Sequence, residues 1–145
     1  NSNQFASAGD DKKIIIWDIN TLSYVCTLED TTYGHTDHIT GLDVTDNGRL
    51  ISVGKDKNII TWLPGSKIMS SKIVTDHLSG NPITCLKVVG GHVATAGDDK
   101  YVKIWDWYGL TKVKEIFINV KINALGVTNY NDELLVGLEN RVIYN

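Results

Sequence analysis

Proline, cysteine and excess positive charge are scarce in this chain of 145 residues. Only two prolines occur, and the 13 glycines are spread along the chain, which excludes a proline-rich linker or a disordered tail. Since 14 basic residues face 17 acidic ones, the net charge is −3, and the strongly basic surface typical of nucleic-acid binding is missing. No apolar run approaches the roughly 18 residues of a membrane helix. We expect an ordered chain without direct nucleic-acid contact or membrane insertion.

The two cysteines, Cys26 and Cys85, are far apart and form no Cys-x-x-Cys motif. They fall in predicted strands, Tyr24 to Leu28 and Ile83 to Val88, so we expect two reduced, buried thiols rather than a disulfide or a metal site. The first residues also lack the basic-then-apolar pattern of a secretory signal. These features favour an intracellular location, in the cytoplasm or the nucleus.

Three segments of the chain repeat one pattern, in which a tryptophan follows a glycine by eight residues. The copies are Ser7-Ala8-Gly9-Asp10-Asp11 with Trp17-Asp18, Ser52-Val53-Gly54-Lys55-Asp56 with Trp62, and Thr95-Ala96-Gly97-Asp98-Asp99 with Trp105-Asp106. Trp17, Trp62 and Trp105 lie 45 and 43 residues apart. A period in this range predicts an array of similar blades.

Each copy reads as a β-hairpin, because a short run ending in glycine is followed by polar residues and then by a β-branched run. The first runs are Phe5 to Gly9, Leu50 to Gly54 and Val93 to Gly97, and the second runs are Ile14 to Ile16, Ile59 to Thr61 and Val102 to Ile104. An aspartate at the third turn position accepts hydrogen bonds from backbone amides of its own turn. The turn is therefore chemically specified.

The second copy is the most complete. Gly34-His35 precedes an alternating run, Ile39 to Val44, and the Ser-Gly turn and Trp62 follow in order. This order closely resembles the WD40 repeat of β-propellers. The resemblance implies an all-β fold of four-stranded antiparallel blades, with strands named a to d outward from a central channel.

Counting strands predicts an incomplete ring of about three and a half blades. We expect strands b, c and d of one blade in residues 1–30, full blades in 31–76 and 77–119, and strands a, b and c in 120–145. The last repeat is degenerate, with Asn140 where aspartate is expected and Tyr144 near the tryptophan position. Because propellers close into rings of four to eight blades, we expect the remainder from a longer chain or from a second chain.

The resemblance also implies a hydrogen-bonding network within each repeat. The expected members are His35, Ser52, Asp56 and Trp62 in the second repeat, Ser7, Asp11 and Trp17 in the first, and Thr95, Asp99 and Trp105 in the third. His77 is a candidate histidine for the third repeat. It precedes Ile83 by six residues, whereas His35 precedes Ile39 by four, so this assignment stays open.

Ser52, His35 and Asp56 have the residue types of a serine hydrolase triad. We favour the structural interpretation, because no Gly-x-Ser-x-Gly elbow is present and the Ser/Thr and Asp recur in other repeats. The chain is predicted not to be an enzyme. Of its four histidines, His35, His38, His77 and His92, the first two are close in sequence. We expect one of them to enter the blade network and the other to begin strand a, so we expect neither a metal nor a cofactor.

If the chain does no chemistry, its function lies on its surfaces. The resemblance implies a platform for other proteins that uses the top face of the ring, where the d-to-a and b-to-c loops emerge. The implied contact positions are Asp10, His38, Thr40, Lys55, Pro82, Thr84, Asp98, Lys121, Asn123 and Glu139. Trp107, Tyr108 and Tyr33 exceed what the repeat requires. Trp107 and Tyr108 follow strand c on the opposite face, either as an exposed aromatic anchor or packed against the next blade.

The repeat pattern and its expected surfaces indicate two candidate functions. The first is a noncatalytic scaffold that docks proteins within a larger assembly. The alternative is a reader of a short peptide motif or modified side chain through a pocket on the top face.

Overall fold

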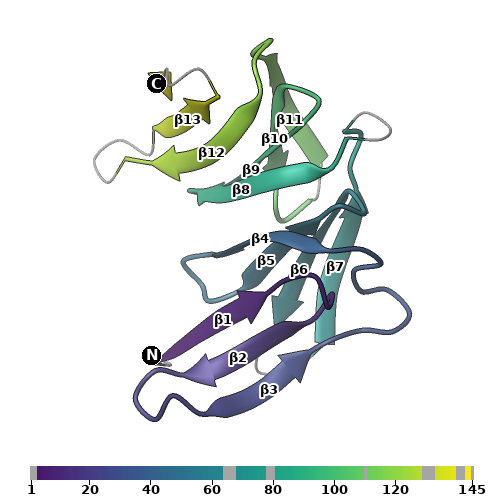
Figure 1. The fold of residues 1–145 in the computed structure, drawn as a ribbon, viewed down its shortest axis with the longest axis vertical. Helices are drawn as coiled ribbons and strands as arrows, with labels where there is room; N and C mark the ends of the chain where they lie inside the picture. Colours follow the sequence, from purple (N-terminus) through teal and green to yellow (C-terminus); the bar gives the residue numbers. More distant parts are fainter. Residues whose placement is uncertain are drawn as a thin grey trace.

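Every regular element of the described chain is a β-strand. The structure, a computed structural model, describes residues 3–63, 68–77, 81–109, 111–128, 133–139 and 143–144. In these ranges the strands form four antiparallel sheets of three or four strands, and sequential strands are neighbours in each sheet. Figure 1 shows the sheets following one another along the molecule, with β1, β4, β8 and β12 at their inner edges. The predicted all-β, unclosed propeller arrangement is confirmed, although the sheets do not all have four strands.

The sheets follow the order of the chain. The first contains β1 (Gln4–Ala8), β2 (Ile14–Asp18) and β3 (Tyr24–Leu28), and the second contains β4 (Ile39–Val44), β5 (Leu50–Gly54), β6 (Asn58–Leu63) and β7 (Ile68–Val74). The third contains β8 (Ile83–Val89), β9 (His92–Gly97), β10 (Tyr101–Asp106) and β11 (Thr111–Phe117), and the fourth contains β12 (Ile122–Val127), β13 (Leu134–Leu138) and β14 (Ile143–Tyr144).

Hydrophobic clusters fill the spaces between adjacent sheets. Ile14 and Leu28 of the first sheet pack with Ile39 and Trp62 of the second. A second cluster joins the second and third sheets, and a third joins the third and fourth. Burying one such side chain contributes about 1.5–3 kcal/mol, so each sheet depends on its neighbours for stability.

Strand burial depends on whether a sheet has neighbours on both faces. In the second sheet every residue of β5 is buried, since sheets cover both of its faces. In the first sheet the equivalent strand β1 is exposed or half-buried throughout. The first sheet therefore has one uncovered face.

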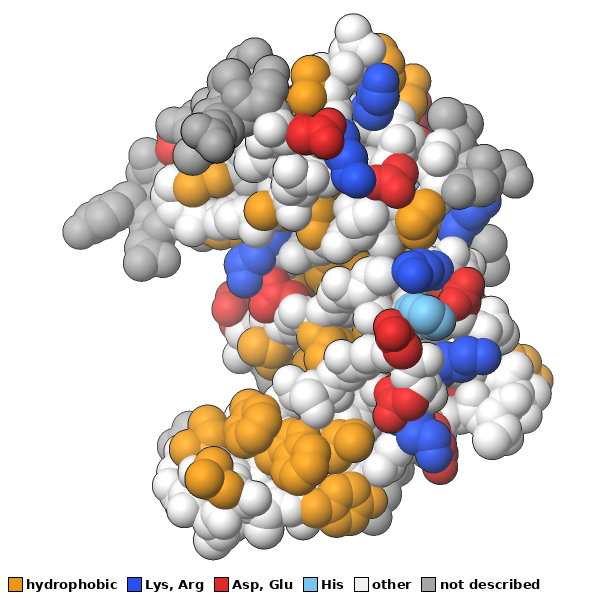
Figure 2. All heavy atoms as spheres, in the orientation of Figure 1, with side chains coloured by type: hydrophobic (Ala, Val, Ile, Leu, Met, Phe, Trp, Pro, Cys, Tyr) orange, Lys and Arg blue, Asp and Glu red, His pale blue; other side chains and the backbone are white. Residues whose placement is uncertain are grey.

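The uncovered face of the first sheet carries an aromatic cluster. Phe5 stacks on Trp17 with ring centroids 6.2 Å apart, and Tyr24 meets Trp17 edge-on at 6.4 Å. Phe5 is 43% exposed and Tyr24 is 59% exposed. In Figure 2 hydrophobic side chains gather over this sheet at the lower left. We define Phe5, Trp17 and Tyr24 as the aromatic end face.

Polar contacts also connect neighbouring sheets. The hydroxyl of Thr40 on β4 donates to the carbonyl of Ile83 on β8 at 2.6 Å. The carboxylate of Asp43 accepts from the amide of Val88 at 2.7 Å and pairs with the ammonium of Lys87 at 2.8 Å. These bonds hold the inner strands side by side.

The structure separates the two aromatic residues that follow β10, because Trp107 is buried against another sheet while Tyr108 stays exposed. Trp107 is only 7% exposed and joins the cluster with Ile51 and Val53 of the second sheet. The guanidinium of Arg49, just before β5, lies 5.6 Å from the centroid of the Trp107 ring, so Trp107 packs against the preceding sheet. Tyr108 is 71% exposed and stacks on Trp107 at 3.8 Å. Tyr33 is also exposed, at 60%.

Both cysteines are free and lie on different sheets. Cys26 on β3 is buried, as expected, whereas Cys85 on β8 is only half-buried. Burial nevertheless raises the pKa of the Cys85 thiol.

Within the described ranges, no helix is long and apolar enough to cross a bilayer.

Candidate functional site

The three hairpin turns share one backbone conformation. Lys12, Lys57 and Lys100 follow the turn aspartates and adopt the left-handed region, with φ of 66°, 62° and 67°. Each lysine amide donates to the carbonyl of the turn glycine at 3.1–3.2 Å. The turn aspartate accepts from the amide two residues later, as Asp56 does from Asn58 at 3.1 Å. The turns thus hold the three aspartates in equivalent places.

The four expected residues of the second repeat form one continuous network. The indole N–H of Trp62 donates to Ser52 Oγ at 2.8 Å, and Ser52 Oγ lies 2.7 Å from His35 Nε2. His35 Nδ1 lies 3.0 Å from both carboxylate oxygens of Asp56. Since a carboxylate only accepts, Nδ1 donates to Asp56, and Nε2 makes the remaining hydrogen bond with the Ser52 hydroxyl.

The environment of Asp56 favours its charged form. Burial opposes ionisation, but hydrogen bonds from His35 and from the amides of Thr36 and Asn58 outweigh it and lower the pKa of Asp56 to about 2. The network therefore contains a stable negative charge that orients the histidine ring.

The third repeat has an equivalent network, and it contains His77. Its Nδ1 lies 2.9 Å from the Asp99 carboxylate and its Nε2 lies 2.9 Å from Thr95 Oγ1, which accepts from the indole of Trp105 at 2.8 Å. The open question about His77 is thereby answered, despite its longer spacing from Ile83. Burial lowers the pKa of His77, although the charge of Asp99 partly opposes the shift.

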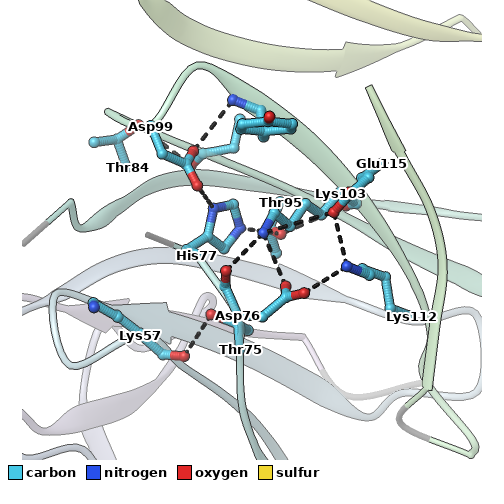
Figure 3. A network of polar contacts seen from close by, with 12 residues as sticks. Lys57, Thr75, Asp76, His77, Thr84, Thr95, Asp99, Lys103, Lys112 and Glu115 are labelled. Atoms are coloured by element: carbon cyan, nitrogen blue, oxygen red, sulfur yellow. Dashed lines mark hydrogen bonds and ion pairs between the residues drawn. The ribbon is translucent and has the colours of Figure 1, made fainter. Parts of the chain in front are cut away.

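A cluster of ion pairs surrounds this third network (Figure 3). Lys103 on β10 lies directly opposite Thr95 in the register with β9, and it is only 4% exposed. Its ammonium donates to the backbone carbonyl of Asp76 at 2.8 Å and to the Asp76 carboxylate at 2.9 Å. Lys112 binds both Asp76 and Glu115 from β11. The residue before His77 is therefore fixed from the third sheet.

These ion pairs also shift the pKa values of their members. Partial burial opposes ionisation of Asp76, but hydrogen bonds from Lys112 and Lys103 lower its pKa to about 2. Hydrogen bonds to Asp76 and Glu115 raise the pKa of Lys112 to about 12. Asp76 and Lys112 are therefore both charged at neutral pH.

The network of the first repeat is smaller. The indole of Trp17 donates to Ser7 Oγ at 2.8 Å, and Asp11 accepts from the amide of Lys13 at 3.2 Å. Ser7 is exposed, in contrast to the fully buried Ser52. In the fourth repeat, Asn140 and the side chain of Tyr144 lie outside the part of the chain that the structure describes.

We define the turn face as the end of the sheets that carries the turns β1–β2, β5–β6 and β9–β10. Six of the predicted contact positions lie there in pairs, because the residue before each turn aspartate position donates its backbone amide to the residue before the inner strand. The amide of Lys55 donates to the carbonyl of His38 at 2.9 Å, that of Asp98 to Pro82 at 3.3 Å, and that of Glu139 to Lys121 at 3.0 Å. Thr40, Thr84 and Asn123 follow one residue inside the inner strands.

Charged side chains of the turn face pair across adjacent sheets. His38 Nδ1 lies 2.8 Å from Asp10 Oδ1, and the ammonium of Lys121 lies 3.7 Å from Asp98 Oδ1. His38, unlike His35, remains half-exposed outside the repeat network. Within the described residues no group of three or more His, Cys, Asp or Glu side chains is arranged to hold a metal ion.

The hollows between the first and second sheets are open rather than enclosed. One of them is lined by Phe5 and Ala6 on one side and by Leu42, Val44 and Leu50 on the other. This hollow runs along the free edge of β1. The strand β1 corresponds to β5, which is paired with the inner strand β4, whereas no described strand pairs with β1 on that side.

Comparison with known families gives a direct match to this repeat. The family described as "WD domain, G-beta repeat" matches residues 1–18, 26–62 and 69–106, more than half of the chain. This chain belongs to the WD40 family.

Individual proteins of known sequence also resemble this WD40 chain. The chain is 27% identical over 139 residues to actin-interacting protein 1 of Caenorhabditis elegans, covering 95% of this chain and 22% of that protein. It is 29% identical over 125 residues to histone acetyltransferase type B subunit 2 of Candida glabrata, covering 72% and 28%. The chain thus spans about a quarter of the length of these relatives.

The solved WD40 β-propeller domain of Doa1 shares the fold, with a TM-score of 0.82 and 23% identity. The match covers 98% of this WD40 chain and 46% of that chain. It therefore supports the architecture of an unclosed propeller.

Sequence reasoning missed several features of this WD40 chain. It did not identify the Lys103–Asp76 pair or the contact of His38 with Asp10. The signal for the first was available, since a lysine stands at Lys103 where the equivalent positions hold Ile15 and Ile60. The second depends on loop geometry that residue types do not reveal.

Proposed function

We propose that this chain is part of a noncatalytic WD40 scaffold that docks other proteins within an intracellular assembly. WD40 propellers generally mediate protein–protein interactions. One contrast carries the proposal for this chain. The serine, histidine and aspartate side chains of the second repeat hydrogen-bond to one another in the interior, whereas charged side chains of both signs are exposed on the turn face. The free cysteines and the net charge of −3 are consistent with an intracellular role away from nucleic acid.

The second repeat has the hydrogen bonds of a catalytic triad but not its accessibility. Ser52 is 0% exposed, and its oxygen already contacts His35 and the indole of Trp62. A nucleophile must face a substrate cleft beside an oxyanion hole. Thr95 with His77 and Asp99 repeats the same bonds in the third sheet. A recurring buried arrangement supports architecture rather than catalysis.

The turn face offers a surface of mixed charge for a folded partner. Asp10 is 87% exposed at its side chain, Lys121 is 49% exposed and Asp98 is 36% exposed. Alternating signs do not generate a single attractive field, so specificity depends on the pattern of contacts.

The rest of the ring is expected to cover the aromatic end face. An exposed cluster of this kind on a sheet with a free edge is characteristic of a surface that another element covers. We propose that further blades, from a longer chain or a second chain, pack there. The names of two relatives, one actin-interacting and one a subunit, are compatible with the proposed docking of other proteins.

A photo-crosslinking experiment tests the docking surface. A crosslinking residue replaces Lys55 or Lys121 in the full-length protein, with Lys114 on the outer strand β11 as the matched control. We expect partner proteins to be captured from the two turn-face positions and not from Lys114. Capture from Lys114 alone would overturn the proposed surface.

A second assay separates the scaffold from the alternative, a reader of a short peptide or modified side chain. Captured partners are tested as folded proteins and as overlapping peptides. A scaffold binds only the folded partner, and Lys55→Glu or Asp98→Lys weakens that binding while Lys114→Glu does not. A short peptide that binds alone, and loses binding in the same variants, would instead establish the reader.

A further inference from the structure

His38 makes two contacts that compete for one nitrogen atom. The residue directly precedes β4, where the turn after β1 meets the second sheet. Its Nδ1 lies 2.8 Å from Asp10 Oδ1 and 3.3 Å from the ammonium of Lys55. Figure 2 shows a histidine among charged side chains of both signs at the right-hand side of the molecule.

The two partners require opposite states of His38 Nδ1. A carboxylate such as Asp10 only accepts hydrogen bonds, and an ammonium such as Lys55 only donates them. An imidazole nitrogen either carries a proton or presents one lone pair in the ring plane. His38 Nδ1 therefore serves Asp10 when it carries a proton and Lys55 when it does not.

The other charged group beside the ring is Asp37. Its carboxylate lies 3.7 Å from His38 Nε2 and accepts from the His38 backbone amide at 2.7 Å. Asp10, Asp37 and Lys55 are thus the charged groups that contact the ring. His35 does not take part, because it is buried in its own network with Asp56.

We propose that His38 is a proton-controlled switch that exchanges Asp10 for Lys55 on the turn face. With the ring protonated, His38 holds Asp10, and Lys55 is released. With the ring neutral and its proton on Nε2, Nδ1 accepts from Lys55, and the exposed Asp10 carboxylate is released.

The exchange changes the sign of the charge that the surface offers. The neutral state offers a carboxylate to a basic side chain of a partner, and the protonated state offers an ammonium to an acidic one. This consequence rests on the proposed docking role of the turn face. The switch itself is a property of the chain alone and is tested without a partner.

The test is an NMR titration of the full-length protein between about pH 5 and 8, where imidazole side chains change charge. The ring resonances of His38 and the side-chain CH₂ and ammonium resonances of Lys55 are followed together. We expect the Lys55 resonances to move with the same midpoint as His38. His38→Gln should remove that movement, and His92→Gln, which changes an exposed histidine on β9, should leave it intact.

Two further variants assign the competing partners. Asp10→Asn removes the group that favours the imidazolium and should lower the His38 midpoint, and Lys55→Met should raise it. All three side chains are at least partly exposed, so the substitutions leave the core unchanged. Lys55 resonances that stay constant through the His38 titration, or a midpoint unchanged by Asp10→Asn, would overturn the switch. Neither result bears on whether the turn face binds proteins.

Discussion

At the scale of single residues, the buried hydroxyls of Ser52 and Thr95 are the centres of their networks. Each accepts from a tryptophan and contacts a histidine, and both side chains are 0% exposed. An unpaired polar group in such a place is costly, because no water replaces the lost partner. The serine that suggests chemistry in the sequence is therefore predicted to be structural.

Ser52→Ala is expected to lower the free energy of unfolding by about 1–3 kcal/mol, because His35 Nε2 and the Trp62 indole lose their partner. Denaturant unfolding of the full-length protein measures the change. Ser7→Ala is the matched control and should cost less, since Ser7 is exposed. An unchanged stability in Ser52→Ala would count against a structural role.

Lys57→Gly is expected to be neutral or slightly stabilising, because glycine adopts a φ of 62° without strain. Lys57→Val should instead lose about 1–2 kcal/mol, since a β-branched side chain is disfavoured in that region. Thermal unfolding compares the two variants. Equal effects of glycine and valine would show that the left-handed turn does not constrain this position.

Acid is expected to destabilise the protein in two stages. Burial lowers the pKa of His77 below its ordinary 6.5, so the unfolded chain takes up this proton first and stability falls as the pH drops below about 6.5. The Asp56 contribution is present above pH 3.8 and is lost as the pH falls toward about 2.

Unfolding free energies measured from about pH 7.5 to 2 check this sequence of events. His77→Gln should flatten the dependence between about pH 7 and 5, whereas the exposed-site control His92→Gln should not. Stability that increases as the pH is lowered through this range would contradict the assignment to His77.

At the scale of elements, the hairpins and inner strands are predictable from sequence because their signals are local. The structure places β4 at Ile39–Val44, the range that the apolar pattern indicates, and β8 at Ile83–Val89, one residue longer than the expected run. Connections are harder to predict, because their lengths vary between repeats. Spacing alone left His77 unassigned, and it could not show that Trp107 packs against the preceding sheet.

The buried Lys103 ammonium holds Asp76 in the connection before His77. We expect substitutions of Lys103 and of Asp76 to have unequal effects on stability. Asp76→Ala leaves the Lys103 ammonium buried with fewer acceptors and should cost about 1–2 kcal/mol. Lys103→Ile should be close to neutral or stabilising, since isoleucine occupies the equivalent positions 15 and 60 and Asp76 keeps Lys112.

Denaturant unfolding, together with hydrogen exchange at Thr75 to His77, measures both effects. Glu115→Gln is the control, because its carboxylate lies 3.9 Å from the Lys103 ammonium and is half-exposed. If Lys103→Ile proves more damaging than Asp76→Ala, the pair stabilises the fold directly and our interpretation of it is wrong.

At the scale of the whole molecule, we propose that these sheets belong to a larger ring and function as a docking platform. The interior sheets are covered on both faces, whereas the first sheet exposes Phe5, Tyr24 and Val25 and a free strand edge. Surfaces of this kind associate with other elements in water.

The most decisive experiment is the solution mass of residues 1–145 expressed alone, by size-exclusion chromatography with light scattering. We expect that this 16.0-kDa chain is not a stable compact monomer. A sharp dimer would show that two copies cover each other's open faces, and aggregation or an unfolded chain would show that other blades are needed. A monodisperse monomer that unfolds cooperatively would contradict the proposal of a larger ring.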